Sequence, residues 1–199
     1  MKENLRTAEI NRQTAETNIK LTLNIDGNGS SQIETGIPFI DHMLTLFTRH
    51  SGCDLNIVAS GDLEVDFHHT VEDLGICLGQ ALSQALGDMG GIARYGEAQI
   101  PMDEALCGAA VDISRRPFLV FNVALTAPKV GELDSELIEE FFRALVVHGG
   151  LTLHLNLYYG KNQHHIFEAA FKATAHALRR AWTQRLELSG QVLSTKGTL

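Results

Sequence analysis

His68-His69-Thr70-Val71-Glu72-Asp73 and His164-His165-Ile166-Phe167-Glu168-Ala169 are two copies of one pattern, HHxxE, in which a histidine pair precedes a glutamate. The copies begin at residues 68 and 164, 96 positions apart, which is about half of the 199-residue chain. One such string arises easily by chance. Two strings separated by half the chain instead indicate an internal duplication of the sequence.

The residues upstream of the two strings support the duplication. Each string follows an expected helix, a glycine-containing joint (Ser51-Gly52 or Gly149-Gly150), a strand and a turn glycine (Gly61 or Gly160). Alternating apolar residues predict the strands, and apolar residues three or four apart predict the helices. The expected strands are 19–25, 31–34, 55–59, 107–113, 118–125 and 151–159, and the expected helices are 38–47, 68–86, 135–147 and 164–186.

These patterns predict an α/β fold of the α+β type, built by internal duplication from two similar halves. Each half should be a small mixed sheet packed against helices. We expect one unit over residues 1–199, with a first half-repeat at about 1–91, a second at about 92–190 and a C-terminal tail at 191–199.

The composition argues against several classes of protein. With 44% hydrophobic residues and no uncharged apolar run of about 18 residues, we expect neither a disordered chain nor a membrane partner. The first 20 residues lack the apolar segment of a secretory signal. The net charge of −8 argues against a nucleic-acid partner. Three cysteines without a CxxC pair predict neither disulfides nor a thiolate zinc site, which fits a reducing cytoplasm.

The HHxxE strings have the spacing of metal ligands. Residues four apart share a helix face, so His68 lies over Glu72 and His164 over Glu168. The second histidine of each string is rotated by about 100° and should address a different ion, which predicts two metal sites. Imidazole and carboxylate without thiolate favour manganese, iron, zinc or cobalt. The alternative is that these histidines are ordinary surface or capping residues.

Of four further histidines, three have two interpretations and His148 has one. Leucine alternates along the strand that carries His154, so this histidine lies on the other face, toward a site or solvent. His42, in a mainly apolar helix, is either a ligand or a hydrogen-bonded core residue. His50 and His148 follow helices, where they either cap C-terminal carbonyls or, for His50, bind an anion.

Several basic and hydroxyl residues suit phosphate recognition, because phosphate accepts bidentate guanidinium and backbone N–H bonds. Lys172 shares a helix face with Glu168, so it is either an anion anchor or half of a Glu–Lys pair. The other candidates are Arg94 after a glycine pair, Arg115-Arg116 before Pro117, and Ser194-Thr195-Lys196-Gly197 in the tail. For each of these residues the alternative is ordinary solvated charge or polarity at the surface.

Taken together, these motifs resemble the imidazoleglycerol-phosphate dehydratase family over nearly the whole chain. The resemblance rests on residues Gly36–Leu44 (GIPFIDHML), His68–Gly75 (HHTVEDLG), Arg94–Gly96 (RYG), Pro101–Ala105 (PMDEA), Leu151–His154 (LTLH), Asn162–Ala173 (NQHHIFEAAFKA) and Ser194–Gly197 (STKG).

The resemblance implies a manganese-dependent hydro-lyase of histidine biosynthesis in the cytoplasm. The reaction removes water from D-erythro-imidazole-glycerol phosphate and gives imidazole acetol phosphate. In this reaction the imidazolate form of the substrate's ring expels the adjacent hydroxyl and leaves a diazafulvene. The resemblance also implies self-association as trimers within a 24-subunit shell, with active sites between subunits and two Mn²⁺ ions in each.

The resemblance also implies roles for individual residues. Glu16 matches a substrate-contacting glutamate, for which we infer acid–base catalysis, with substrate positioning as the alternative. The implied metal ligands, also counted as catalytic, are His42, His68, His69, Glu72, His154, His164, His165 and Glu168. The implied substrate-binding residues are Glu16, His50, Arg94, Arg116, Lys172, Ser194, Thr195 and Lys196.

Two other classes of function compete with this interpretation. A di-metal hydrolase such as a phosphatase would need carboxylates that bridge the metals and would release inorganic phosphate. A non-catalytic metal-storage or shell protein would show no turnover, and the spread of candidate phosphate anchors argues against it.

Overall fold

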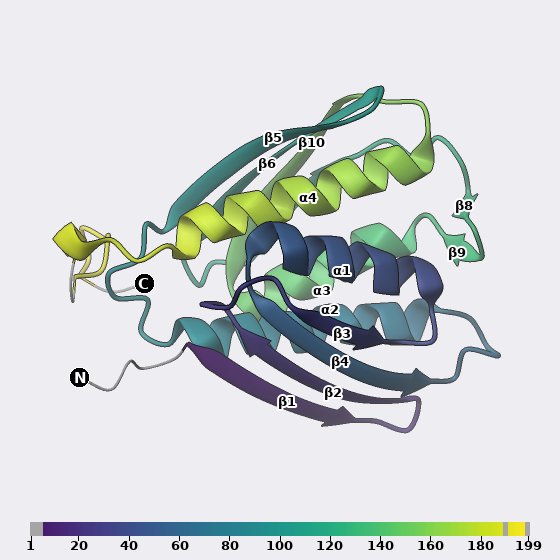
Figure 1. Ribbon diagram of the computed structural model, residues 1–199, viewed down its shortest axis with the longest axis horizontal. Helices are drawn as coiled ribbons and strands as arrows, with labels where there is room; N and C mark the ends of the chain where they lie inside the picture. The colour runs from purple at the N-terminus through teal and green to yellow at the C-terminus, as the bar shows by residue number, and fades with distance from the viewer. Residues whose placement is uncertain (1–5, 189–190, 198–199) are drawn as a thin grey trace.

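The computed structural model describes residues 6–188 and 191–197, and its elements follow each other in two similar series (Figure 1). The first series is β1 (Thr7–Gln13), β2 (Thr17–Asn24), β3 (Ser31–Glu34), α1 (Pro38–Ser51), β4 (Asp54–Gly61) and α2 (His68–Leu86). The second is β5 (Tyr95–Met102), β6 (Ala105–Ile113), β7 (Phe118–Asn122), β8 (Lys129–Val130), β9 (Leu133–Asp134), α3 (Leu137–Gly149), β10 (Leu151–Tyr159), α4 (Gln163–Trp182) and the short 3₁₀ helix η1 (Leu186–Leu188).

The two halves repeat one sheet topology. The first sheet has the order β1-β2-β4-β3 and the second the order β5-β6-β10-β7. In each sheet the first three strands are antiparallel and the fourth runs parallel to the third. The small β8–β9 ribbon has no counterpart among the described residues of the first half. The predicted duplication of mixed sheets with helices is therefore confirmed, whereas the boundary near residue 91 stays a prediction.

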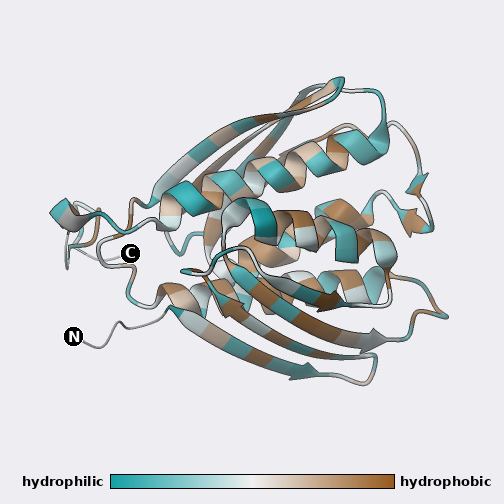
Figure 2. Ribbon diagram, in the orientation of Figure 1, coloured by the Kyte–Doolittle hydropathy of each residue, from teal (hydrophilic) through white to brown (hydrophobic). Residues whose placement is uncertain are grey.

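The helices lie between the two sheets (Figure 1), so each sheet has one covered face. Hydrophilic and hydrophobic residues alternate along the strands (Figure 2). In β2 the side chains of Ile19, Leu21 and Leu23 are buried, while the intervening residues point outward. In β10, Leu151, Leu153 and Leu155 are buried in the same way and Leu157 is half-buried, as their alternation predicts.

The long helices join the two halves. α2 packs on β1 and β2 of its own sheet and against α3 of the other half, whereas α4 packs on β5 and β6 and against α1. Phe171 of α4 stacks on Phe141 of α3 and tilts against Phe142. Buried residues of both halves consequently form one hydrophobic cluster. None of the helices in the described part of the chain is long and apolar enough to cross a membrane.

Some element limits differ from the predicted ones. The first strand of each half, β1 and β5, was not predicted, because these edge strands each bury a single residue, Ile10 or Ala98. The helix predicted over 164–186 ends at Trp182, and the strand predicted over 118–125 ends at Asn122. The helix predicted over 38–47 continues to Ser51 and is followed by Gly52, whose φ of 77° suits glycine.

Two glycines of α2 allow α3 to approach closely. A Cβ atom on Gly75 would lie 2.5 Å from the carbonyl oxygen of Phe141, and one on Gly79 would lie 2.7 Å from that of Leu145. Both obstacles are backbone atoms, which cannot rotate away. The two glycines therefore set the distance between the helices that link the halves.

We predict that Gly75→Ala lowers the free energy of unfolding by about 1–2 kcal/mol, because overpacking outweighs the better helix propensity of alanine. Urea denaturation at a fixed protein concentration measures the change. Gln84→Ala on the exposed side of α2 is the matched control and should stay within about 0.5 kcal/mol of the original chain. Equal stability of the two variants would contradict the close approach.

Candidate metal centre

Three side chains meet where α1 packs against α4. The Nε2 atoms of His42 and His164 lie 3.1 Å and 3.0 Å from Glu168 Oε1. One potential ligand atom from each residue lies within 4.8 Å of the other two, and no other such group of three occurs among the residues that the structure describes. Two imidazoles and a carboxylate suit divalent manganese, iron, zinc or cobalt, so the donor set fits the expected metal.

Local contacts in α4 and α1 orient the side chains of His164 and His42. The side-chain oxygen of Asn162 caps α4 by accepting a hydrogen bond from the N–H of His164 at 2.9 Å. The ring of Phe39 packs edge-on against the His164 ring with centroids 5.3 Å apart. His42 is one turn into α1, which begins with Pro38 at a position where proline favours helix initiation.

Glu168 is held in its ionised form. Only 8% of its side chain is exposed, and Lys172 Nζ donates to Oε2 at 2.5 Å while the imidazoles face Oε1. Burial raises the pKa of Glu168, but hydrogen bonds from Lys172, His42 and His164 outweigh burial and lower that pKa to about 2. The carboxylate is thus charged at neutral pH, as a metal ligand must be. Lys172 forms the Glu–Lys pair that was one of its two interpretations.

The second histidine of each HHxxE string faces a carboxylate from outside its own helix. His69 Nδ1 lies 3.0 Å from Asp62 Oδ2 and 3.8 Å from Glu16 Oε2, and His165 Nδ1 lies 2.7 Å from Glu104 Oε2. These carboxylates raise the pKa of both histidines. Sequence patterns did not predict that Asp62 and Glu104 contact these histidines, because a loop carboxylate resembles solvated charge. Their positions, after a turn glycine and at a hairpin tip, were the available signal.

The structure does not bring the remaining expected ligands to the His42 group. His68 and Glu72 lie in the first turns of α2, which packs against α3, and α3 has no histidine before His148. His154 is exposed on the outer face of β10, opposite the buried leucines. In the described part of the chain, three of the eight expected ligands therefore converge.

Arg94 is buried and anchors the C-terminal tail. Its guanidinium contacts both carboxylate oxygens of Asp112, at 2.7 Å and 3.0 Å, and also donates to the carbonyl oxygen of Leu193. Arg116 contacts the same carboxylate at 3.3 Å and is largely exposed. Residues 194–196 directly follow Leu193, so the expected phosphate-binding residues of the tail lie beside the two arginines.

These residues lie far from the metal centre of the same chain. The N–H of Arg94 donates to the carbonyl oxygen of Ala181 near the end of α4, whereas Glu168 is in its second turn. At 1.5 Å per helical residue the separation is roughly 20 Å.

His50 lies in the last turn of α1, where its Nδ1 atom is 3.2 Å from Nε2 of His176, a partner that the sequence did not indicate.

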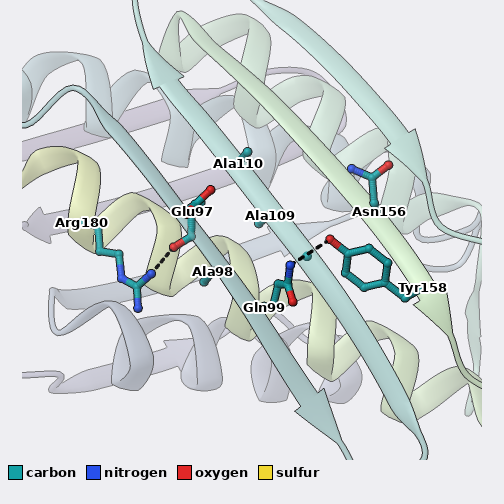
Figure 3. A pocket seen from close by; sticks show the side chains of 9 residues that line it. Glu97, Ala98, Gln99, Ala109, Ala110, Asn156, Tyr158 and Arg180 are labelled. Atoms are coloured by element: carbon teal, nitrogen blue, oxygen red, sulfur yellow. Dashed lines mark hydrogen bonds between the residues drawn. The ribbon is translucent and has the colours of Figure 1, made fainter.

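The outer face of the second sheet carries a separate hollow (Figure 3), with Glu97, Gln99, Tyr158 and Arg180 among its lining residues. Gln99 Nε2 donates to Tyr158 Oη at 3.3 Å, and Arg180 donates to the carbonyl oxygen of Glu97 at 2.5 Å. No histidine occurs among the described residues that line it, so this hollow is distinct from the metal centre. It shares the outer face that bears His154.

The duplicated α/β fold brings histidine and carboxylate side chains together between its helices, which is the arrangement of a candidate metal-binding enzyme. The sequence model described as imidazoleglycerol-phosphate dehydratase matches residues 35–178, and the chain belongs to this family.

Comparisons with individual proteins agree over almost the full length. Imidazoleglycerol-phosphate dehydratases of Pelobacter propionicus and Trichlorobacter lovleyi are 56% and 58% identical over 194 residues, which are 98% of this chain and 99% of each relative. The crystal structure of the Staphylococcus aureus enzyme has a TM-score of 0.83 at 46% identity, covering 90% of this chain and 99% of that one. The Pyrococcus furiosus enzyme, in complex with (S)-C348, has a TM-score of 0.82 at 37% identity and covers 96% of this chain and 100% of that one.

We predict that His42→Gln lowers the affinity for Mn²⁺ at least about tenfold, because it removes one imidazole from the converging group. Titration of the metal-free protein, with free Mn²⁺ followed by electron paramagnetic resonance, measures the change. His148→Gln, which alters an exposed histidine at the end of α3, is the control and should bind as the original chain does. Unchanged affinity in both variants would remove His42 from the site.

Proposed function

We propose that this chain is a hydro-lyase that removes water from imidazoleglycerol phosphate to give imidazole acetol phosphate in histidine biosynthesis. Membership of the family and identities of 56% and 58% to dehydratases of nearly equal length support the proposal. The observation that carries it is the convergence of His42, His164 and Glu168 in a chain of this family. Three buried free cysteines suit the reducing cytoplasm in which we place the reaction.

Two Mn²⁺ ions per active site are part of the proposal. His42, His164 and Glu168 would hold one ion together with a further histidine. The rest of the proposed ligand set is His68, His69, Glu72, His154 and His165. When bound, the ions supply Lewis acidity to the nitrogens of the substrate's imidazole ring.

Glu16 is the proposed acid–base group. Its carboxylate is exposed at the tip of the β1–β2 hairpin, where 54% of the side chain is accessible, and lies 3.8 Å from His69. The electrons of the deprotonated ring would expel the hydroxyl of the ring-bound carbon, which takes up the proton released from the ring N–H and leaves as water. An Oε atom of Glu16 would then accept the proton from the carbon that keeps its hydroxyl, and that C–H electron pair forms the enol double bond. Return of this proton to the ring-bound carbon yields the ketone, while the proton lost from the enol hydroxyl restores the ring N–H.

The phosphate-binding residues have a positioning role in this proposal. Lys172, Arg94, Arg116, His50 and the tail residues Ser194, Thr195 and Lys196 would hold the phosphate group and so fix the reacting carbons. Binding energy gained at the remote phosphate is then used for orientation.

We further propose that the active site is completed between subunits, in trimers that assemble into a 24-subunit shell. Two observations support this part. Arg94, which binds the backbone just before the proposed phosphate residues of the tail, lies roughly 20 Å along α4 from the candidate metal centre of its own chain, and His154 points outward from its sheet. Exposed aromatic side chains on the second sheet, Tyr95, Phe118, Tyr158 and Tyr159, offer apolar area for association.

Exhaustive chelation should abolish turnover, and added Mn²⁺ should restore it, because both proposed sites need the ion to bind the imidazole ring. Product formation measures activity, and sedimentation velocity measures assembly before and after chelation. Chelator already saturated with Mn²⁺ is the control. Full activity and unchanged assembly in the metal-free protein would show the two-ion proposal to be wrong.

Glu16→Gln should reduce kcat by about 10²–10⁴-fold, the usual contribution of a positioned acid or base, while Mn²⁺ affinity stays the same. Steady-state kinetics at saturating Mn²⁺ measures the loss. Glu9→Gln changes an exposed glutamate of the same hairpin and should retain kcat. Normal turnover of Glu16→Gln would reduce Glu16 to substrate positioning at most.

A further inference from the structure

We propose that Glu104 and Asp62 are positioning residues, each of which orients the second histidine of one HHxxE string so that its Nε2 atom is available to a metal ion. The inference rests on the proposed function, because His165 and His69 are ligands only in that proposal. It also explains why the two halves treat equivalent glutamates differently.

The sheet topology makes Glu16 and Glu104 structural counterparts. β1 and β2 occupy the same places in the first sheet as β5 and β6 in the second. The tip of the first hairpin is residues 14–16, and that of the second is residues 103–104. Each tip therefore offers a glutamate to the start of the long helix that packs on the same sheet, where the HHxxE string lies.

Both carboxylate oxygens of Glu104 face the start of α4. Its Oε1 atom accepts the backbone N–H groups of Lys161 and Asn162 at 3.1 Å and 2.7 Å. Its Oε2 atom lies 2.7 Å from His165 Nδ1. This carboxylate ties the hairpin tip to the helix, and both of its oxygens are already engaged there.

A carboxylate at Nδ1 decides what the other ring nitrogen does. When Nδ1 carries the proton and donates it to a carboxylate, Nε2 keeps its lone pair for a metal ion. For His165 the nearest acidic oxygen on the Nε2 side belongs to Asp103, at 3.7 Å, which is beyond hydrogen-bonding distance. Glu104 therefore orients the His165 ring through Nδ1, while Nε2 has no hydrogen bond to an acidic group among the described residues.

In the first half, Asp62 takes over the orienting contact. Its Oδ2 and Oδ1 atoms lie 3.0 Å and 3.3 Å from His69 Nδ1, while Glu16 remains at 3.8 Å. The Asp62 side chain is 21% exposed and that of Glu16 is 54% exposed. Because Asp62 orients His69, Glu16 does not have to orient this histidine as Glu104 orients His165. The Glu16 side chain therefore stays accessible to a substrate.

The test compares the Mn²⁺ dependence of turnover in Glu104→Ala, Asp62→Ala and Glu16→Gln. For the first two we expect the half-saturating Mn²⁺ concentration to rise about 10–100-fold, with turnover restored at saturating Mn²⁺. Glu16→Gln should show the opposite behaviour, an unchanged half-saturating concentration and lost turnover at every concentration. Glu132→Ala, in the β8–β9 turn, is the control for removal of an exposed carboxylate.

Direct titration of metal-free protein with Mn²⁺ gives a readout that does not depend on activity. Glu104→Gln keeps an acceptor oxygen and should recover part of the affinity that Glu104→Ala loses, whereas a general folding defect would not be corrected by added metal. Unchanged Mn²⁺ affinity in Glu104→Ala and Asp62→Ala would overturn the inference. So would a folded Glu104→Ala protein whose turnover stays lost at saturating Mn²⁺. Failure of the unaltered chain to bind Mn²⁺ would instead overturn the proposed function.

Discussion

The burial of two apolar sheet faces against one shared layer of helices is the constraint on which the rest of the structure depends. Each sheet exposes polar residues on its outer face, so its inner face must be covered. Because each long helix packs on its own sheet and on a helix of the other half, residues distant in sequence come together. His42 meets Glu168 for this reason, although 126 residues separate them. The metal centre is thus placed by core packing.

The sequence predicted those features that depend on local spacing. The HHxxE strings were placed at helix starts, and the leucine alternation of β10 predicted that His154 faces outward. It did not reveal β1 and β5, since an edge strand with one buried residue has almost no alternation. It also did not predict the contact of Asp62 with His69, because contacts of a loop carboxylate depend on tertiary geometry.

The arrangement within one chain also separates binding functions in space. The ligands that converge lie at the start of α4, while Arg94 and the tail lie at its other end. Arg94 is a buried cation whose charge is already matched by Asp112, so its most evident task in the folded chain is to hold the backbone at Leu193. The placement of residues 194–196 therefore depends on an ion pair in which they take no part.

The joining of two equivalent halves in one polypeptide has a consequence for sequence change. In a symmetric dimer of identical half-length chains, every substitution would appear twice, once at each equivalent place. If the glutamate at the hairpin tip formed hydrogen bonds to the neighbouring helix in one copy, it would have to form them in the other copy as well. A single gene that encodes both halves removes this obligation. Residues at equivalent places, such as the glutamates of the two hairpin tips, are free to mutate independently and to acquire separate duties within the same architecture.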